Sequence, residues 1–64
     1  MKIIRIYNRY YSEPIESYIA FAQVRINGQY RYERLYCRTA DEVQSLTEGQ
    51  TIPEHYRHYW RNEP

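Results

Sequence analysis

The chain has 64 residues, a formal net charge of +1, and nine Tyr against one Phe and one Trp. A chain this short makes one domain, spanning 1–64, and buries only about 60% of its unfolded surface. The near-neutral charge excludes a generic polyanion binder, and no apolar run approaches the roughly 20 residues of a membrane span. A single Cys excludes an intramolecular disulfide and gives no sign of an oxidising compartment. Together with the absence of a long apolar run, this leads us to expect a soluble cytoplasmic protein without membrane association.

The first predicted element is a strand at about 2–11. Its alternating pattern places Ile4 and Ile6 on one side of the strand. The other side then carries Ile3, Arg5, Tyr7 and Arg9. Pro14 ends the strand because it lacks a backbone N–H and restricts the residue before it. The short link that follows favours an antiparallel neighbour.

Two further strands, at about 17–27 and 29–38, form a hairpin around Asn27-Gly28. This pair favours a type I′ turn, in which both central residues need a positive φ. Placing the turn there fixes the register, which sets Ala20 opposite Leu35 and Phe21 opposite Arg34. One face of the hairpin is therefore small and aliphatic, and we expect Ile4 and Ile6 to join it.

The opposite face is rich in Arg and Tyr, and we call it the Arg/Tyr face. On the predicted register it carries Arg5, Tyr7, Arg9, Phe21, Gln23, Arg25, Tyr30, Tyr32, Arg34, Tyr36 and Arg38. None of the acidic residues falls on it, and Glu33 lies on the aliphatic side. An ordinary alternative is that it forms the solvated side of a one-sided sheet, stabilised by Arg–Tyr pairs.

After the hairpin the spacing of apolar residues changes from two to three, which predicts a short helix at about 40–48. Thr39 and Glu42 fit a capping box, and Gly49 is a plausible stop. The apolar stripe of Ala40, Val43 and Leu46 should pack on the aliphatic sheet face. The predicted fold class is therefore α+β, a three-stranded antiparallel sheet with one helix on one face.

The tail at 52–61 is predicted to be a short helix or an extended arm. Tyr56, Tyr59 and Trp60 recur at the spacing of one helical side. They either complete the core, cover an open sheet edge, or form a homodimer or partner contact. If they covered the Arg/Tyr face, that face would become a second core instead of a binding surface.

The hairpin at Asn27-Gly28, the aromatic Tyr36, and the run Arg38-Thr39 with Asp41-Glu42-Val43 resemble, in outline, a known DNA-binding module. It is the sheet-plus-helix module at the N-terminus of phage-type tyrosine integrases. The resemblance implies that the sheet face away from the helix enters the major groove. The Lys-rich composition common in that family is absent, since Lys2 is the only Lys.

No group of residues predicts catalysis, a cofactor or a metal site. His55 and His58 have a spacing able to share a metal, but no third ligand is apparent. Cys37 is predicted to be a small buried hydrophobe opposite Tyr18, without the partners of a nucleophile. Gly-rich phosphate loops are absent. We therefore expect a non-enzymatic binding protein.

Two functions remain open. In the first, the Arg residues of the Arg/Tyr face contact nucleic-acid phosphates and its aromatic rings stack on bases. In the second, the chain is an inhibitor or adaptor of the phage or mobile-element type, such as an anti-CRISPR protein, and binds a host protein complex. That partner could meet the Arg/Tyr face or the acidic residues Asp41, Glu42 and Glu48.

Overall fold

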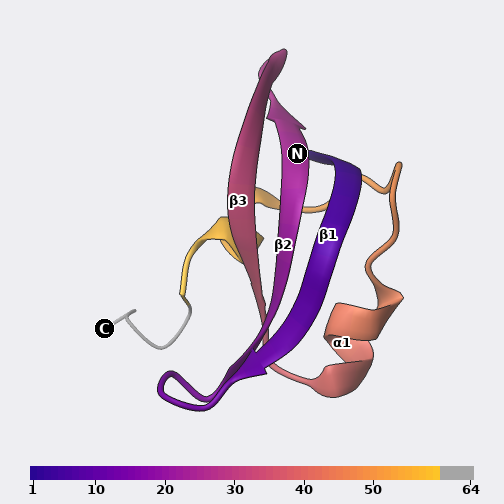
Figure 1. Cartoon of the computed structure of the whole chain (residues 1–64). Helices are drawn as coiled ribbons and strands as arrows, with labels where there is room; N and C mark the ends of the chain where they lie inside the picture. The colour runs from indigo at the N-terminus through magenta and orange to yellow at the C-terminus, as the bar shows by residue number, and fades with distance from the viewer. Residues whose placement is uncertain (60–64) are drawn as a thin grey trace.

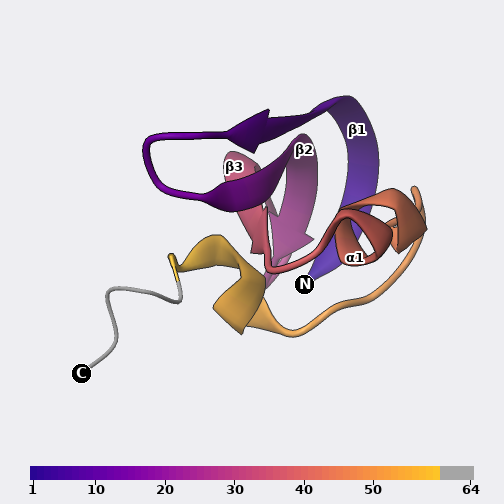
Figure 2. The same ribbon diagram turned by 90° about the horizontal axis from the view of Figure 1, so that it is seen from below.

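The computed structural model describes residues 1–59 and has the predicted α+β architecture (Figure 1). Its elements are β1 (Lys2–Ser12), β2 (Ser17–Ile26), β3 (Gln29–Cys37), α1 (Ala40–Ser45) and the 3-10 helix η1 (Glu54–Arg57). The strands form one antiparallel sheet in the order β1-β2-β3. Figure 2 shows α1 and η1 on the same side of this sheet. Neither helix among residues 1–59 is long and apolar enough to span a membrane.

The β2–β3 hairpin has the predicted turn and register. Asn27 and Gly28 have φ of 51° and 79°, as a type I′ turn requires. Pairing runs from Ile26 opposite Gln29 to Tyr18 opposite Cys37 without a shift. The alternation of the two faces along β2 and β3 is therefore confirmed.

The β1–β2 pairing contains two irregularities that the alternating pattern did not predict. The register shifts between Ile3 and Arg5 and again between Ile6 and Asn8, so that one residue of β1 is extra each time. Such bulges turn the following side chains to the other face of the strand. As a result Ile3, Ile6 and Arg9, each three residues apart, all lie on the core side of β1.

Three of the predicted faces in β1 are therefore corrected. Ile3, predicted on the Arg/Tyr face, pairs with Val24 and is fully buried in the core. Arg9, also predicted there, pairs with Ala20 and lies on the side of α1. Ile4, predicted on the aliphatic face, is the extra residue of the first bulge and is only half-buried. Ile6 packs against the core as predicted.

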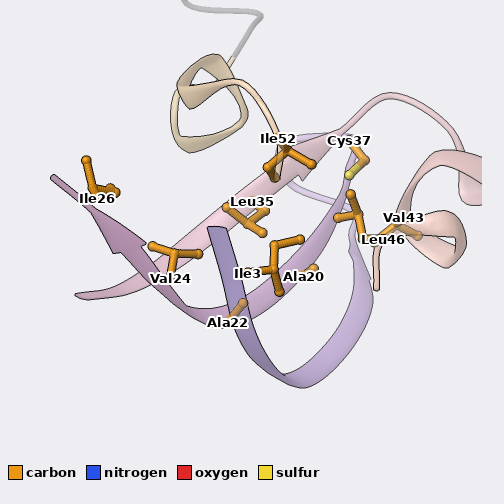
Figure 3. Packing of buried hydrophobic residues seen from close by; sticks show 10 residues of the cluster. All are labelled: Ile3, Ala20, Ala22, Val24, Ile26, Leu35, Cys37, Val43, Leu46 and Ile52. Carbon is orange, nitrogen blue, oxygen red and sulfur yellow. The ribbon is translucent and has the colours of Figure 1, made fainter. Parts of the chain in front are cut away.

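The core lies between the sheet and the segments that follow it (Figure 3). Its buried members are Ile3, Ala20, Ala22, Val24, Ile26, Leu35, Cys37, Val43, Leu46 and Ile52. Full burial of an Ile, Val or Leu side chain is worth about 1.5–3 kcal/mol relative to its exposure. The two Ala residues of β2 leave room for the larger side chains from β1 and α1.

Helix α1 begins as predicted but is shorter. The Thr39 hydroxyl accepts the Glu42 N–H at 3.1 Å, and the Glu42 carboxylate accepts the Arg38 N–H at 2.7 Å. The helix ends at Ser45 because Leu46 is already extended, with φ −68° and ψ 133°. Gly49, predicted as the stop, has φ +89° and lies in the next turn.

Arg9 binds the C-terminal end of α1. Its Nε donates to the Val43 carbonyl at 3.2 Å, and its Nη2 donates to the Leu46 carbonyl at 2.6 Å. The last turn of α1 contains no basic residue of its own. Arg9 therefore supplies the positive charge and the donors that the end of a helix needs.

The segment after α1 covers the outer edge of β1. Ile3 donates its N–H to the Gln50 carbonyl at 2.9 Å and accepts the Gly49 N–H at 2.7 Å. The Glu48 carboxylate accepts the Ile6 N–H at 3.0 Å, so the hydrogen bonds between this segment and β1 extend towards the middle of the strand. This contact protects the first half of an otherwise open sheet edge.

The tail predicted as a short helix or an extended arm at 52–61 contains parts of both alternatives in the residues described. Residues 51–53 are extended, and only Glu54–Arg57 form a single 3-10 turn. No side chain caps this turn. The last residues of the predicted segment, Trp60 among them, lie outside the described residues.

Replacing Arg9 by Met should lower the free energy of unfolding by about 1–3 kcal/mol, because two carbonyls of α1 lose a charged donor. Urea unfolding followed by circular dichroism would measure the change. Arg31→Met is a matched control, since within residues 1–59 the Arg31 guanidinium donates only to the exposed Gln29 side chain. The control should change stability by less than about 0.5 kcal/mol. Equal losses in the two variants would contradict a capping role for Arg9.

Candidate nucleic-acid interface

The sheet face away from α1 is the Arg/Tyr face, and most of its predicted members lie there. Arg25 pairs with Tyr30, Phe21 with Arg34, and Gln23 with Tyr32 across the hairpin. Arg5 pairs with Gln23 from the other side. Glu33, the only acidic residue in the three strands, pairs with the core residue Ala22 and so lies on the opposite face. The face is thus cationic, and the one strand carboxylate, Glu33, borders it only at the edge of β3, where it pairs with Arg57.

Three aromatic rings gather in the middle of this face. Tyr7 lies 6.0 Å from Phe21 and 6.1 Å from Tyr32, and Phe21 lies 6.3 Å from Tyr32, between ring centroids. Their exposed fractions are 48%, 37% and 64% in the order Tyr7, Phe21, Tyr32. Exposed apolar surface that is contiguous marks an interaction site more often than scattered exposed residues do. We call these three residues the ring cluster.

Cationic side chains surround the ring cluster. The Arg5 guanidinium lies 5.8 Å from the centroid of the Tyr7 ring, within cation–π range. Arg25 and Arg34 form no salt bridge within residues 1–59. Their charges are therefore not neutralised by a carboxylate in the described part of the chain.

The bulges add three residues that the sequence pattern did not assign to this face. Lys2 pairs with Arg25, Asn8 with Phe21, and Tyr10 with Ile19. Simple alternation had put all three beside Ile4 and Ile6. Residues 2–12 contain no Gly or Pro that would mark a bulge, so only the pairing reveals it.

One end of the Arg/Tyr face is closed by Tyr59. Its ring lies 5.6 Å from that of Tyr36, and its hydroxyl donates to the Ile15 carbonyl in the β1–β2 turn. Tyr36 is half-buried, and Ile19 beside it is only 3% exposed. Among residues 51–59, Tyr59 therefore covers this end of the face, and the rings of the ring cluster remain exposed.

Tyr56 lies on the other side of the β3 edge. It packs against the core, and its hydroxyl donates to the Glu42 carboxylate at 3.4 Å. The prediction that Tyr56 and Tyr59 share one helical side is wrong, because η1 ends at Arg57 and Tyr59 follows in extended chain. Trp60, the third predicted member, is not among the described residues.

Arg38 follows β3 and is separated from the ring cluster. It lines a hollow of about 250 Å³ whose other lining residues are Tyr36, Glu42, His55, Tyr56 and His58. Within residues 1–59 no three His, Cys, Asp or Glu side chains are grouped closely enough to hold a metal ion. This hollow therefore offers no metal site in the described part of the chain.

Of the acidic residues Asp41, Glu42 and Glu48, proposed as a contact for a protein partner, two form hydrogen bonds within the protein. The Glu42 carboxylate accepts hydrogen bonds from the Arg38 backbone and the Tyr56 hydroxyl. The Glu48 carboxylate accepts the Ile6 N–H. Two of the three carboxylates thus have structural roles, and these account for them without a partner.

Cys37 is fully buried at the end of β3, as predicted. Burial raises the pKa of its thiol to about 12, and the nearby Glu42 carboxylate adds to the increase. A thiol with so high a pKa is neutral at physiological pH and a poor nucleophile. The residue therefore belongs to the core and not to a reactive site.

Comparison of the chain with protein-family models, with curated proteins and with solved structures found no match.

Stability should fall as the pH rises from about 9 towards 12, since the unfolded chain releases the Cys37 proton near pH 9 and the folded chain retains it. Burial and Glu42 also raise the pKa of Tyr56, which acts in the same direction. Urea midpoints measured at pH 7 and pH 10.5 would show the loss. The variant Cys37→Ala should show a smaller loss over this interval. An equal loss would assign the effect to other groups.

Proposed function

We propose that this protein is a non-enzymatic, cytoplasmic nucleic-acid-binding protein that uses its Arg/Tyr face. The observation that carries the proposal is an exposed ring cluster on a cationic sheet face without a strand carboxylate. Side chains of this kind combine phosphate contacts with stacking on bases. The proposed contacts are Lys2, Arg5, Tyr7, Phe21, Arg25, Tyr30, Tyr32 and Arg34.

The guanidinium groups and the aromatic rings of this face would make different contacts with a nucleic acid. The guanidinium groups of Arg5, Arg25 and Arg34 supply donors that match phosphate oxygens in a bidentate geometry. The rings of Tyr7, Phe21 and Tyr32 supply stacking that is tolerant of base identity. Affinity should therefore depend on salt through the first group and on ring area through the second.

The small net charge limits long-range attraction but does not oppose local binding. The formal charge is +1 for the whole chain, yet no acidic residue of the strands lies on the Arg/Tyr face. Screening confines charge effects to about 8–10 Å at physiological ionic strength, so the local face matters more than the total. We therefore expect modest affinity that weakens with salt.

Reversing charge at Arg25 and Arg34 together (Arg25→Glu, Arg34→Glu) should weaken binding of a labelled oligonucleotide by at least about tenfold at low salt. Loss of two phosphate contacts should also reduce the slope of log affinity against log salt by roughly 1.4 to 1.8. Fluorescence anisotropy over a series of salt concentrations measures both quantities.

The matched comparison is Arg25→Glu against Arg31→Glu. Each substitution changes the net charge equally and each position is exposed, but Arg31 pairs with Val24 and lies on the opposite face. Arg31→Glu should leave the salt slope nearly unchanged. If the wild-type chain binds neither DNA nor RNA at low salt, or if both variants weaken binding equally, the proposal fails.

A further inference from the structure

A hollow of about 260 Å³ lies beside the ring cluster, towards the edge of β3. Its lining residues are Phe21, Tyr32, Glu33, Arg34, Tyr36 and Arg57. Pockets for drug-sized ligands usually measure about 300–1,000 Å³. This hollow is smaller, so it suits a single flat ring system and not a larger ligand.

The aromatic walls of the hollow suit a stacked base. The planes of the Phe21 and Tyr32 rings differ by only 19°, so both rings offer faces of similar orientation. The Tyr36 ring is held in place by its contact with Tyr59 at 5.6 Å between centroids. The sheet and the tail together therefore order the rings before any ligand binds, which lowers the entropic cost of binding.

The polar walls suit the edge of a base or its phosphate. Arg57 pairs with Glu33 at 3.2 Å and with Glu54 at 3.4 Å. Its Nε is buried without a hydrogen-bond partner within residues 1–59. Arg34 adds a second guanidinium to the same hollow. Because Arg57 is paired with Glu33 and Glu54, Arg34 is the guanidinium of the hollow that no carboxylate among residues 1–59 pairs with.

We infer that this hollow receives one unpaired base of a single-stranded nucleic acid, with the adjoining phosphate held by Arg34. The inference rests on the proposed function and names its substrate class. A base inside a duplex is covered on both faces by its neighbours, so it cannot stack on Tyr32 without leaving the helix. Single strands offer unstacked bases at no such cost. Single-stranded ligands should therefore bind more tightly than duplexes of the same sequence.

The test uses the full chain and oligothymidylates that carry one 2-aminopurine, a fluorescent base whose emission is quenched by stacking. The single strand, the duplex formed with its complement, and the RNA equivalent of the single strand are titrated in parallel. We expect quenching on binding of the single strands and at least about tenfold weaker binding of the duplex. The RNA arm decides whether the sugar affects recognition.

Tyr32→Ala and Tyr11→Ala are the variants compared in this test. Both rings are exposed, at 64% and 50%, but Tyr11 pairs with the core-packed Tyr18, away from the Arg/Tyr face, and does not line the hollow. Tyr32→Ala should weaken single-strand binding by about 5- to 150-fold, the range for loss of one stacked base. Tyr11→Ala should weaken it by less than about threefold.

The outcomes separate this inference from the proposed function. If the duplex binds as tightly as the single strand, or if the two Tyr variants behave alike, the base site is refuted. The proposed function still stands in that case, provided that charge reversal at Arg25 and Arg34 weakens binding by at least about tenfold. If the wild-type chain binds none of the oligonucleotides, both fail together.

Discussion

The two bulges of β1 are the constraint on which the rest of the structure depends. They bring Ile3, Ile6 and Arg9 to the core side of the sheet at a spacing of three residues. Ile3 then fills the core, and Arg9 reaches the end of α1. A helix of six residues is unstable by itself, so its position depends on this contact and on the burial of Val43 and Leu46. Without the second bulge, Ile6 and Arg9 would lie on opposite faces of β1.

The same bulges shape the open face. The shift at Tyr7 brings its ring against Phe21 and Tyr32, and the following residues place Asn8 and Tyr10 on this side. Compared with the predicted Arg/Tyr face, the observed face lacks Arg9 but includes Lys2, so it remains cationic. The ring cluster is therefore a product of pairing across all three strands and not of the hairpin alone.

The rest of the described chain, up to Tyr59, leaves the centre of this face exposed. Helix α1 and the segment after it pack on the core side, where their carboxylates accept backbone N–H groups. Tyr59 covers the end near Tyr36, and Tyr56 turns to the core. Of the two tail tyrosines that the structure describes, Tyr59 therefore contacts the Arg/Tyr face and Tyr56 packs against the core.

Sequence alone determined the hairpin, its register, the helix cap at Thr39 and the burial of Cys37. Each follows from local chemistry: a two-residue turn fixes pairing, and a hydroxyl three residues before an amide caps a helix. Tertiary structure decided the faces of β1, the role of Arg9, the early end of α1 and the paths of Tyr56 and Tyr59. A bulge needs no special residue, and a short tail has no stable conformation until it packs. Those features therefore depend on contacts between residues distant in the chain, which no local pattern encodes.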